Sequence, residues 1–218
     1  MVEQTIPTAE RLVQAAFELF DERGYDETTV DDIAARAGVG RTTFFRHYGS
    51  KEAVIFPAHE ELLSRITARL ESASEATRDL AVVEAARIVL RHYVAEGDRA
   101  RQRYRLIGRV PALRDREMAG QRRYQRTFAA GLVGRWPGDP DAGLRAELMS
   151  AGVVAAHNHV LRAWLRGDTD DPEGDLDRAM GLVIAQASSD EAATTVLVVQ
   201  SAHGPTEVAD RVRRALTD

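Results

Sequence analysis

The side chains best suited to contact a nucleic acid gather between residues 28 and 52. Arginine, lysine, histidine and threonine donate hydrogen bonds to phosphate oxygens, and arginine and threonine also read base edges. The segment from Ile33 to Lys51 holds five basic or imidazole residues and no acidic residue, although the chain carries a net charge of −5. A basic stretch in an acidic chain is typical of a surface that binds DNA.

Two short helices are needed to present those side chains. Four apolar residues fall at i, i+3, i+4 and i+7, the spacing of one buried helical face: Val30, Ile33, Ala34 and Ala37. Thr29 and Asp32 have the spacing of a capping box at the start of this helix. Gly38 suits its end, where the backbone needs a positive φ.

A second helix is expected to begin at Arg41, with Phe44 and Tyr48 on its inner face. Its outer face then carries Thr42, Thr43, Phe45 and Arg46. This arrangement is the plan of a helix-turn-helix, in which the second helix enters the major groove of DNA. The other interpretation is an ordinary helical hairpin with a solvated basic face.

Residues 8–55 resemble the N-terminal domain of the tetracycline-repressor-like (TetR) transcriptional regulators. The resemblance rests on Ala16, Leu19, Phe20, Gly24, Tyr25, Thr28, Thr29, Val30, Ile33, Ala34, Ala37, Gly38, Val39, Thr43, Phe44, His47, Tyr48, Lys51 and Glu52. Two positions depart from the family pattern. Gly40 stands where serine is common, so the second helix lacks a hydroxyl N-cap, and Phe45 stands where tyrosine is usual.

The resemblance implies a ligand-responsive repressor that binds a palindromic operator in double-stranded DNA as a homodimer. The residues expected to read bases are Arg41, Thr42, Thr43 and Phe45. Those expected to hold phosphates are Thr29, Arg46, His47 and Lys51. Phosphate contacts position the protein, and base contacts specify the sequence.

The resemblance also implies an all-α fold with three parts. Residues 1–50 are expected to form a three-helix helix-turn-helix domain, residues 51–189 a helical ligand-binding and dimerisation domain, and residues 190–218 a C-terminal extension. Apolar periodicity and helix signals predict helices at about 8–23, 51–75, 79–96, 114–135 and 142–166, a helix ended by Pro111, and another that begins at Pro172.

The extension contains a run of β-branched residues, 194–200, that favours a strand. A lone strand leaves its backbone groups unpaired, so we expect two such strands to pair across the dimer axis. The other interpretation continues the preceding helix through residues 190–200. After Gly204 and Pro205 the pattern predicts an amphipathic helix.

A second unusual stretch, residues 99–126, contains ten arginines in 28 positions. Arg101, Arg105 and Arg109 repeat at i, i+4 and i+8, which stacks like charges on one helical face. One interpretation is a solvated face paired with acidic residues elsewhere. The other is a cationic mouth over an apolar pocket, suited to a phosphate-bearing amphiphile.

The C-terminal half resembles TetR regulators that sense long-chain acyl-CoA, including the mycofactocin-type regulators, through residues 104–126 and 160–172. The resemblance implies pocket residues Tyr93, Tyr104, Ile107, Phe128, His157 and Trp164, and phosphate partners Arg105, Arg109 and Arg123. Other interpretations are a different small hydrophobic ligand, an enzyme with an accessory helix-turn-helix, and an architectural DNA-binding protein that senses nothing.

The sequence predicts no enzyme, cofactor or metal site. It has no cysteine, and it carries no phosphate loop, nucleophile elbow or HExxH pattern. His157 and His159, at i and i+2, point to different helical faces, so shared metal ligation is disfavoured. We expect a cytoplasmic protein, because no signal peptide and no apolar run of about 20 residues is present.

Overall fold

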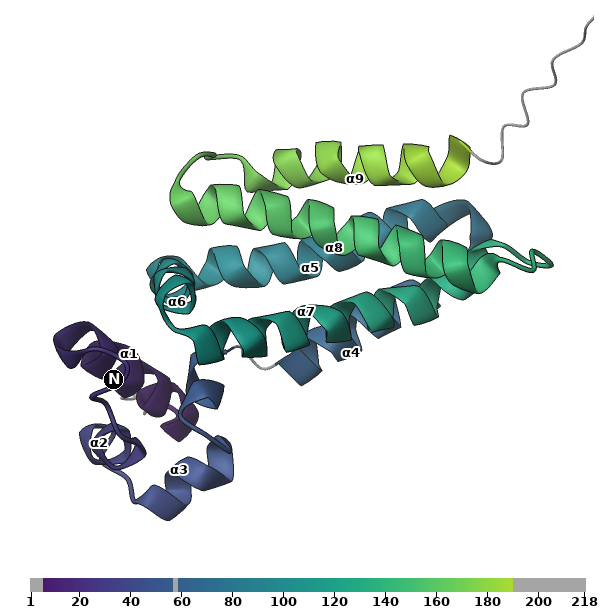
Figure 1. The fold of residues 1–218 in the computed structure, drawn as a ribbon. Coiled ribbons are helices and arrows are strands. Elements are labelled where there is room, and N and C mark those ends of the chain that lie inside the picture. The colour runs from purple at the N-terminus through teal and green to yellow at the C-terminus, as the bar shows by residue number, and fades with distance from the viewer. Residues whose placement is uncertain (1–5, 57–58, 190–218) are drawn as a thin grey trace, which may run out of the picture. The chain divides into compact units, whose positions relative to one another are not determined.

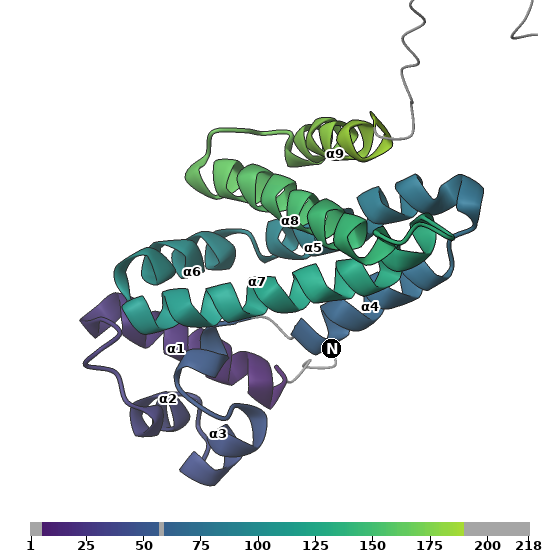
Figure 2. The same cartoon turned by 45° about the vertical axis from the view of Figure 1, so that its right-hand side comes forward.

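The computed structural model describes residues 6–56 and 59–189, and every regular element within those residues is helical. The all-α expectation is therefore confirmed for the described part of the chain. Three helices precede residue 50 and pack together, and the later helices form layers beside them (Figures 1 and 2). The elements are α1 Thr8–Arg23, α2 Val30–Arg36, α3 Arg41–His47, η1 Glu52–Ile55, α4 His59–Glu71, η2 Glu75–Thr77, α5 Arg78–Glu96, α6 Asp98–Arg109, α7 Pro111–Leu132, η3 Val133–Arg135, α8 Ala142–Arg166 and α9 Pro172–Ser189.

The helix-turn-helix forms as its local signals predict. The Thr29 hydroxyl accepts a hydrogen bond from the Asp32 backbone, and the Asp32 carboxylate accepts one from the Thr29 backbone, which completes the capping box. Gly38 adopts φ +69° in the turn. The Phe44 side chain is fully buried, and it anchors α3 against the other two helices. Gly40 supplies no side-chain cap to α3, as its lack of a hydroxyl implies.

The expected single helix over residues 51–75 is wrong. A short 3₁₀ helix, η1, ends at Ile55, and α4 begins only at His59. Phe56 between them is extended, with φ −90° and ψ 148°. The physical reason is Pro57, because its ring disfavours helical backbone in the residue before it. Pro57 itself lies outside the described residues.

The remaining boundaries follow proline and glycine signals. The predicted ranges of α5 and α8 agree with the observed helices to within one residue. The helix expected at 114–135 instead runs from Pro111 to Leu132, because Pro111 occupies its first position, where the missing N–H costs nothing. The helix predicted to begin at Pro172 does so, and the Asp171 carboxylate caps it by accepting a hydrogen bond from the Gly174 backbone. The strand and helix expected within 190–218 lie outside the described residues.

Two hydrophobic clusters hold these helices together. The C-terminal cluster is built from α4, α5, α7, α8 and α9. The N-terminal cluster contains the three helix-turn-helix elements and continues past residue 50 through Val54, Ile55 and Phe56. It also includes Ile107 from α6 and Leu113 from α7. The first three helices therefore share their hydrophobic core with η1, with the end of α6 and with the start of α7.

Candidate DNA-reading surface and effector cavity

The outward face of α3 carries the side chains predicted to read DNA bases. Arg41, Thr42 and Phe45 are exposed, with 43% of the Phe45 surface accessible. Thr43 is less accessible, since its side chain is half-buried. The Arg41 guanidinium lies 5.2 Å from the centre of the Phe45 ring and forms an ion pair with Asp31 at 2.8 Å. Both partners are well exposed, so the pair is weak and open to exchange for a phosphate or a base edge.

The residues predicted to hold phosphates divide into two groups. Arg46 and His47 are exposed at the end of α3 and are available to a phosphate. Thr29 and Lys51 have structural duties instead. The Thr29 hydroxyl serves the capping box, and the Lys51 ammonium donates to the backbone carbonyls of Tyr25 and Thr28 at 2.8 Å each. Two of the three ammonium protons of Lys51 are thus directed inward.

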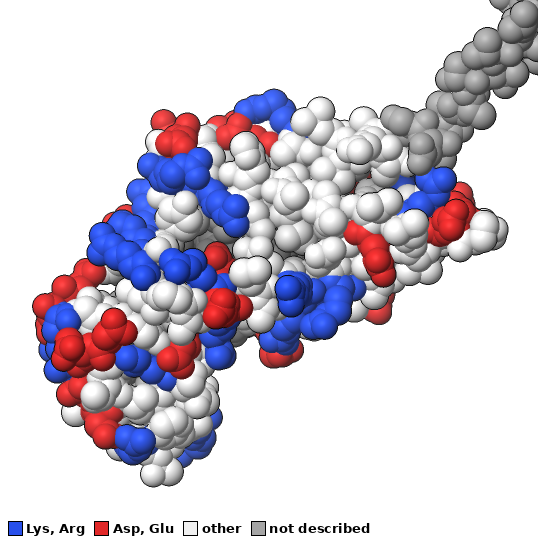
Figure 3. Space-filling view, in the orientation of Figure 1, with Lys and Arg blue, Asp and Glu red and all other residues white. Residues whose placement is uncertain are grey.

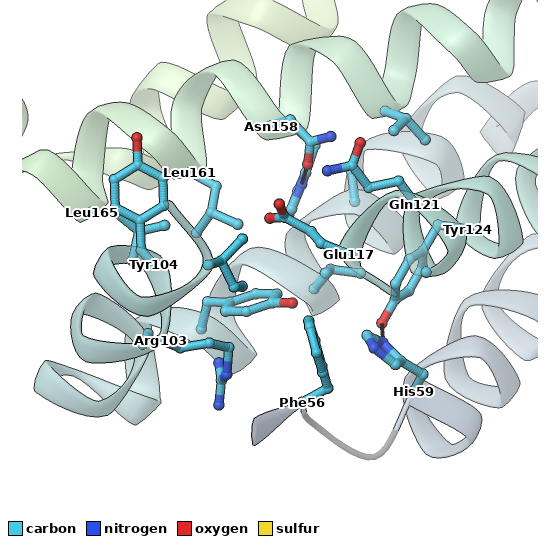
Figure 4. A pocket seen from close by; sticks show the side chains of 18 of the residues that line it. Phe56, His59, Arg103, Tyr104, Glu117, Gln121, Tyr124, Asn158, Leu161 and Leu165 are labelled. Carbon is cyan, nitrogen blue, oxygen red and sulfur yellow. Dashed lines mark hydrogen bonds between the residues drawn. The ribbon is translucent and has the colours of Figure 1, made fainter. Parts of the chain in front are cut away.

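A cavity lies among α5, α6, α7 and α8, next to the junction with the helix-turn-helix (Figure 4). Its volume of about 80 Å³ exceeds the roughly 10–15 Å³ that one water needs. It is well below the roughly 300–1,000 Å³ of a typical pocket for drug-sized molecules. Apolar and aromatic side chains form most of its wall: Phe56, Ala86, Val89, Tyr93, Ala100, Ile107, Tyr124, Phe128, Val153, Val154, Leu161 and Leu165. A ligand of drug size must therefore widen the cavity.

Polar side chains gather on one side of the cavity. Glu117 and Gln121 come from successive turns of α7, and Asn158 faces them from α8 (Figure 4). Burial raises the pKa of Glu117, and the charge of Arg162 opposes that shift. His157 also lines the cavity and is 8% exposed, and burial lowers its pKa to about 4. The imidazole is therefore neutral at pH 7.

A second polar contact closes the cavity near the domain junction. His59, the first residue of α4, lies with its Nδ1 2.9 Å from the Tyr124 hydroxyl, as the dashed line in Figure 4 marks. Burial lowers the pKa of His59 to about 4, with smaller contributions from Arg123 and Arg103. Burial likewise raises the pKa of Tyr124. The two groups form a neutral hydrogen-bonded pair in the cavity wall.

Arg103 joins the cavity to the helix-turn-helix. The side chain is 4% exposed and lines the cavity beside Tyr93. Its Nε donates to the carbonyl of Ile55 in η1 at 2.5 Å, and its two Nη atoms donate to the Glu96 carboxylate at 2.6 and 2.8 Å. A single planar guanidinium thus holds η1, α5 and α6 in one arrangement.

The structure brings together some of the sequence-predicted ligand residues and separates others. Tyr93, Tyr104, Ile107, Phe128 and His157 line the cavity. Trp164 does not, because its ring lies under the guanidinium of Arg101 at 5.0 Å. Arg123 does not either, since it pairs with Glu60 and borders a separate groove between α4 and α7.

The other two predicted phosphate partners lie beside the cavity and do not line it. Arg105, Arg109 and Arg114 border a shallow groove whose remaining residues include Tyr104, Ile107 and Glu117. These last three residues also line the cavity, so the groove and the cavity share a wall. Figure 3 shows basic side chains gathered over the region of α6. The result is an apolar cavity with a basic groove beside it.

Sequence reasoning missed several cavity residues: Phe56, His59, Arg103, Glu117, Gln121, Tyr124 and Asn158. The i, i+4 spacing of Glu117 and Gln121 on one helical face was the only available signal. Among the described residues, no three His, Asp, Glu or Cys side chains are grouped to hold a metal ion. His157 is buried and His159 exposed, as their spacing predicts. No described helix is both long and apolar enough to span a bilayer.

Two family models match this sequence. The model described as bacterial regulatory proteins, tetR family, matches residues 12–57, and the MftR C-terminal domain matches residues 78–188. The chain is 29% identical over 171 residues to the HTH-type transcriptional regulator TcmR of Streptomyces glaucescens, covering 75% of this chain and 76% of that protein. It is also 29% identical over 166 residues to the putative mycofactocin biosynthesis transcriptional regulator MftR of Mycobacterium tuberculosis, covering 74% and 82%.

Solved structures share the fold. A putative TetR-family regulator from Syntrophomonas wolfei superposes with a TM-score of 0.59 at 17% identity, covering 88% of this chain and 98% of that one. FadR of Thermus thermophilus, a TetR-family repressor crystallised with lauroyl-CoA, superposes with a TM-score of 0.50 at 21% identity, covering 90% and 100%. Likeness at these identities establishes the fold alone.

Proposed function

Because this chain belongs to the TetR family of bacterial transcriptional regulators, we propose that it is a repressor that releases its operator when an amphiphilic anion binds. DNA binding and regulation follow from the family, whose members are regulators rather than enzymes. The proposal adds the direction of the response and the chemistry of the effector. It places the protein in the cytoplasm, where its DNA partner lies.

The exposed face of α3 is the proposed DNA-reading surface. Arg41, Thr42, Thr43 and Phe45 contact bases, and Arg46 and His47 contact phosphates. The Phe45 ring offers apolar contact, for example to a thymine methyl group, where a tyrosine would add a hydroxyl. Thr29 and Lys51 contribute mainly through their backbone and by fixing the turn, since their polar atoms already have internal partners.

The effector is proposed to be a long-chain acyl-CoA or a similar amphiphilic anion. The single observation that carries this proposal is that the apolar cavity shares Tyr104, Ile107 and Glu117 with a groove bordered by Arg105, Arg109 and Arg114. An apolar chain fits the cavity, and an anionic head group fits the arginines. FadR, which was crystallised with lauroyl-CoA, offers an analogy among proteins of this fold.

The small volume of the cavity suggests how an effector would act. A long acyl chain needs more than about 80 Å³, so it binds only a form in which the helices around the cavity have moved apart. A ligand that prefers one conformation shifts the population toward it. The movement reaches the DNA-reading surface through Arg103, which holds η1, and through Ile107, which lies in both the cavity wall and the N-terminal core.

A homodimer is proposed to place two DNA-reading surfaces on a palindromic operator, in major grooves about 34–36 Å apart. Three large leucines on α8 and α9 support this proposal because they are strongly exposed: Leu144 at 56%, Leu148 at 64% and Leu182 at 75%. Apolar side chains at such exposure are typical of an interaction surface. The domain limits at residues 50 and 189 remain part of the proposal.

The test is fluorescence anisotropy of a labelled duplex from upstream of the protein's own gene, at fixed salt, because salt alone changes DNA affinity strongly. We expect oleoyl-CoA to lower the affinity and free CoA to leave it unchanged. A double variant, R105A with R109A, should respond only at higher oleoyl-CoA concentration. Arg123→Ala is the matched control, since Arg123 lies at another groove. If neither compound changes the DNA affinity, the proposed effector is wrong, whereas the assignment of the protein as a DNA-binding regulator is unaffected.

A further inference from the structure

The cavity contains a buried nitrogen without a protein partner. Nε2 of His157 makes no hydrogen bond to any atom of the described residues, and the side chain is 8% exposed. A buried polar atom without a hydrogen-bond partner is costly, and most buried polar atoms in native proteins have a partner in the protein, in water or in a ligand. His157 lines the cavity, so a bound ligand can reach this nitrogen.

The neighbours of His157 decide which hydrogen-bonding role Nε2 takes. Its other ring nitrogen, Nδ1, lies 3.4 Å from the side-chain oxygen of Asn158, which is an acceptor. This contact favours the neutral tautomer with its proton on Nδ1, because only a protonated nitrogen can donate. Nε2 then carries a lone pair and accepts a hydrogen bond. The partner it requires is a donor.

Glu117 belongs to the polar side of the cavity. Its carboxyl group enters the cavity from α7, close to Asn158 and Gln121 (Figure 4). These three side chains come from the two facing helices α7 and α8, and His157 lies next to Asn158 on α8. A polar ligand group therefore has polar side chains around it in this part of the cavity.

We infer that the effector carries a hydroxyl group on its apolar part, and that this hydroxyl donates its one hydrogen bond to Nε2 of His157. This inference rests on the proposed function, because it names the chemistry of the effector of that same cavity. The ligand class is an amphiphile with an anionic head group at the groove of Arg105 and Arg109 and a hydroxyl group beside His157 in the cavity. Gln121 and Asn158 complete the polar wall around the hydroxyl.

The test compares probes that differ only in the hydroxyl group. The probes are ω-hydroxyoctanoate, ω-hydroxydodecanoate and ω-hydroxyhexadecanoate, each paired with its parent fatty acid, and binding is measured by calorimetry on the full chain. For the pair whose length matches the cavity we expect the hydroxy acid to bind about five- to tenfold tighter, the value of one added hydrogen bond. The other lengths should show a smaller ratio.

Three variants assign the effect to residues. His157→Phe keeps an aromatic ring but removes Nε2, so the affinity ratio should fall to about one. His157→Leu also removes Nε2 and serves as a second test if the first variant folds poorly. His159→Phe is the matched control, because His159 lies on the same helix and is exposed. It should preserve the wild-type ratio.

The outcomes separate this inference from the proposed function. If the parent acids bind and release DNA but the hydroxyl group brings no gain at any length, or the gain survives both cavity variants, the inference is wrong and the amphiphilic effector stands. If none of the acids binds, the affinities of 1-naphthol and naphthalene are compared by the same calorimetry, because these two compounds differ only in the hydroxyl group. A His157-dependent preference for 1-naphthol then supports the hydroxyl site and overturns the anionic effector, and its absence overturns both.

Discussion

Two threonines of the helix-turn-helix carry hydroxyl groups with different duties. The Thr29 hydroxyl belongs to the capping box of α2, whereas Thr42 is exposed on α3. Sequence spacing alone predicted the first duty, because a capping box is a local pattern. The second depends on DNA and stays a prediction.

Replacing Thr29 by alanine should destabilise the protein by about 1 kcal/mol, the usual value of an N-cap hydroxyl. Urea denaturation measures the change. Thr42→Ala is the matched control and should alter stability by less than about 0.5 kcal/mol, while it weakens operator binding. Equal losses of stability in the two variants would contradict the assignment of the cap to Thr29.

Buried histidine should make the protein sensitive to acid. The pKa of His157 is about 4 in the folded protein against an ordinary value of 6.5, so the unfolded chain binds more protons between these values. The contribution of His157 to the free energy of unfolding is therefore fully present above pH 6.5. It is lost as the pH falls toward 4, and the loss is on the order of 3 kcal/mol. His59, whose pKa is also about 4, contributes with the same sign.

The measurement is the urea midpoint across this pH range. His157→Phe should flatten the dependence in part, leaving the contribution of His59. His159→Phe should follow the wild type, since that side chain is exposed. A midpoint of the His157→Phe variant that falls with acid as steeply as the wild-type midpoint would show that His157 is not the buried neutral group described.

At the scale of elements, the arginine-rich helix shows where sequence reasoning stops. Periodicity correctly grouped Arg105 and Arg109 on one face, and both border the groove beside the cavity. It could not identify Arg103, which is buried between α6 and η1. Helical spacing states which residues share a face, but only tertiary contacts decide which face is buried. Uniform arginine content removed the polarity contrast that would have marked the buried face.

Arg103→Met should destabilise the protein by about 3 kcal/mol. The substitution leaves the Ile55 carbonyl and the largely buried Glu96 carboxylate without their donor. Chemical denaturation provides the value. Arg105→Met, an exposed neighbour on the same helix, should change stability by less than about 0.5 kcal/mol. Similar losses of stability in the two variants would show that the hydrogen bonds of Arg103 to Ile55 and Glu96 do not stabilise the protein as described.

Glycines of the helical layers offer a packing test. A Cβ added at Gly131 would lie 2.7 Å from Leu70 Cδ1 and 3.0 Å from Leu70 Cβ, so Gly131→Ala crowds α7 against α4. Crowding of about 1–3 kcal/mol outweighs the helix gain of about 1 kcal/mol, and the variant should be less stable. Gly143→Ala in α8 meets open space and should stabilise by up to about 1 kcal/mol. Thermal unfolding of both variants decides, and a more stable Gly131→Ala would contradict the close contact.

For the whole molecule, the sequence predicted the fold class and most helices because their signals are local: caps, prolines and apolar stripes. It failed over residues 51–75, where the effect of Pro57 on Phe56 divides one predicted helix into η1 and α4. For the cavity it predicted Tyr93, Tyr104 and Phe128 of the aromatic wall. It missed Glu117 and Asn158, because the packing of α7 against α8 depends on tertiary contacts. Trp164 was predicted as a pocket residue on the same grounds, but its ring packs under the guanidinium of Arg101 instead.

The proposed dimer gives a prediction at this scale. Leu148→Glu places a charge next to Leu144 on the exposed face of α8, where 64% of the Leu148 surface is accessible, so it should produce monomers. Sedimentation velocity reports the mass. Leu80→Glu is the control, because Leu80 is also exposed, at 52%, but lies on α5. A dimer that persists in the Leu148→Glu variant would place the interface elsewhere.

The sharing of Ile107 between the cavity wall and the N-terminal core has a consequence for protein engineering. Chimeric regulators can be made by fusing the helix-turn-helix domain of one protein, called the head below, to the ligand-binding domain of another. A junction at residue 50 would give the new head a mismatched partner, because η1, Ile107 and Leu113 complete the native head. A working biosensor built from this chain should carry these contacts across with the head, treating them as one transplantable unit.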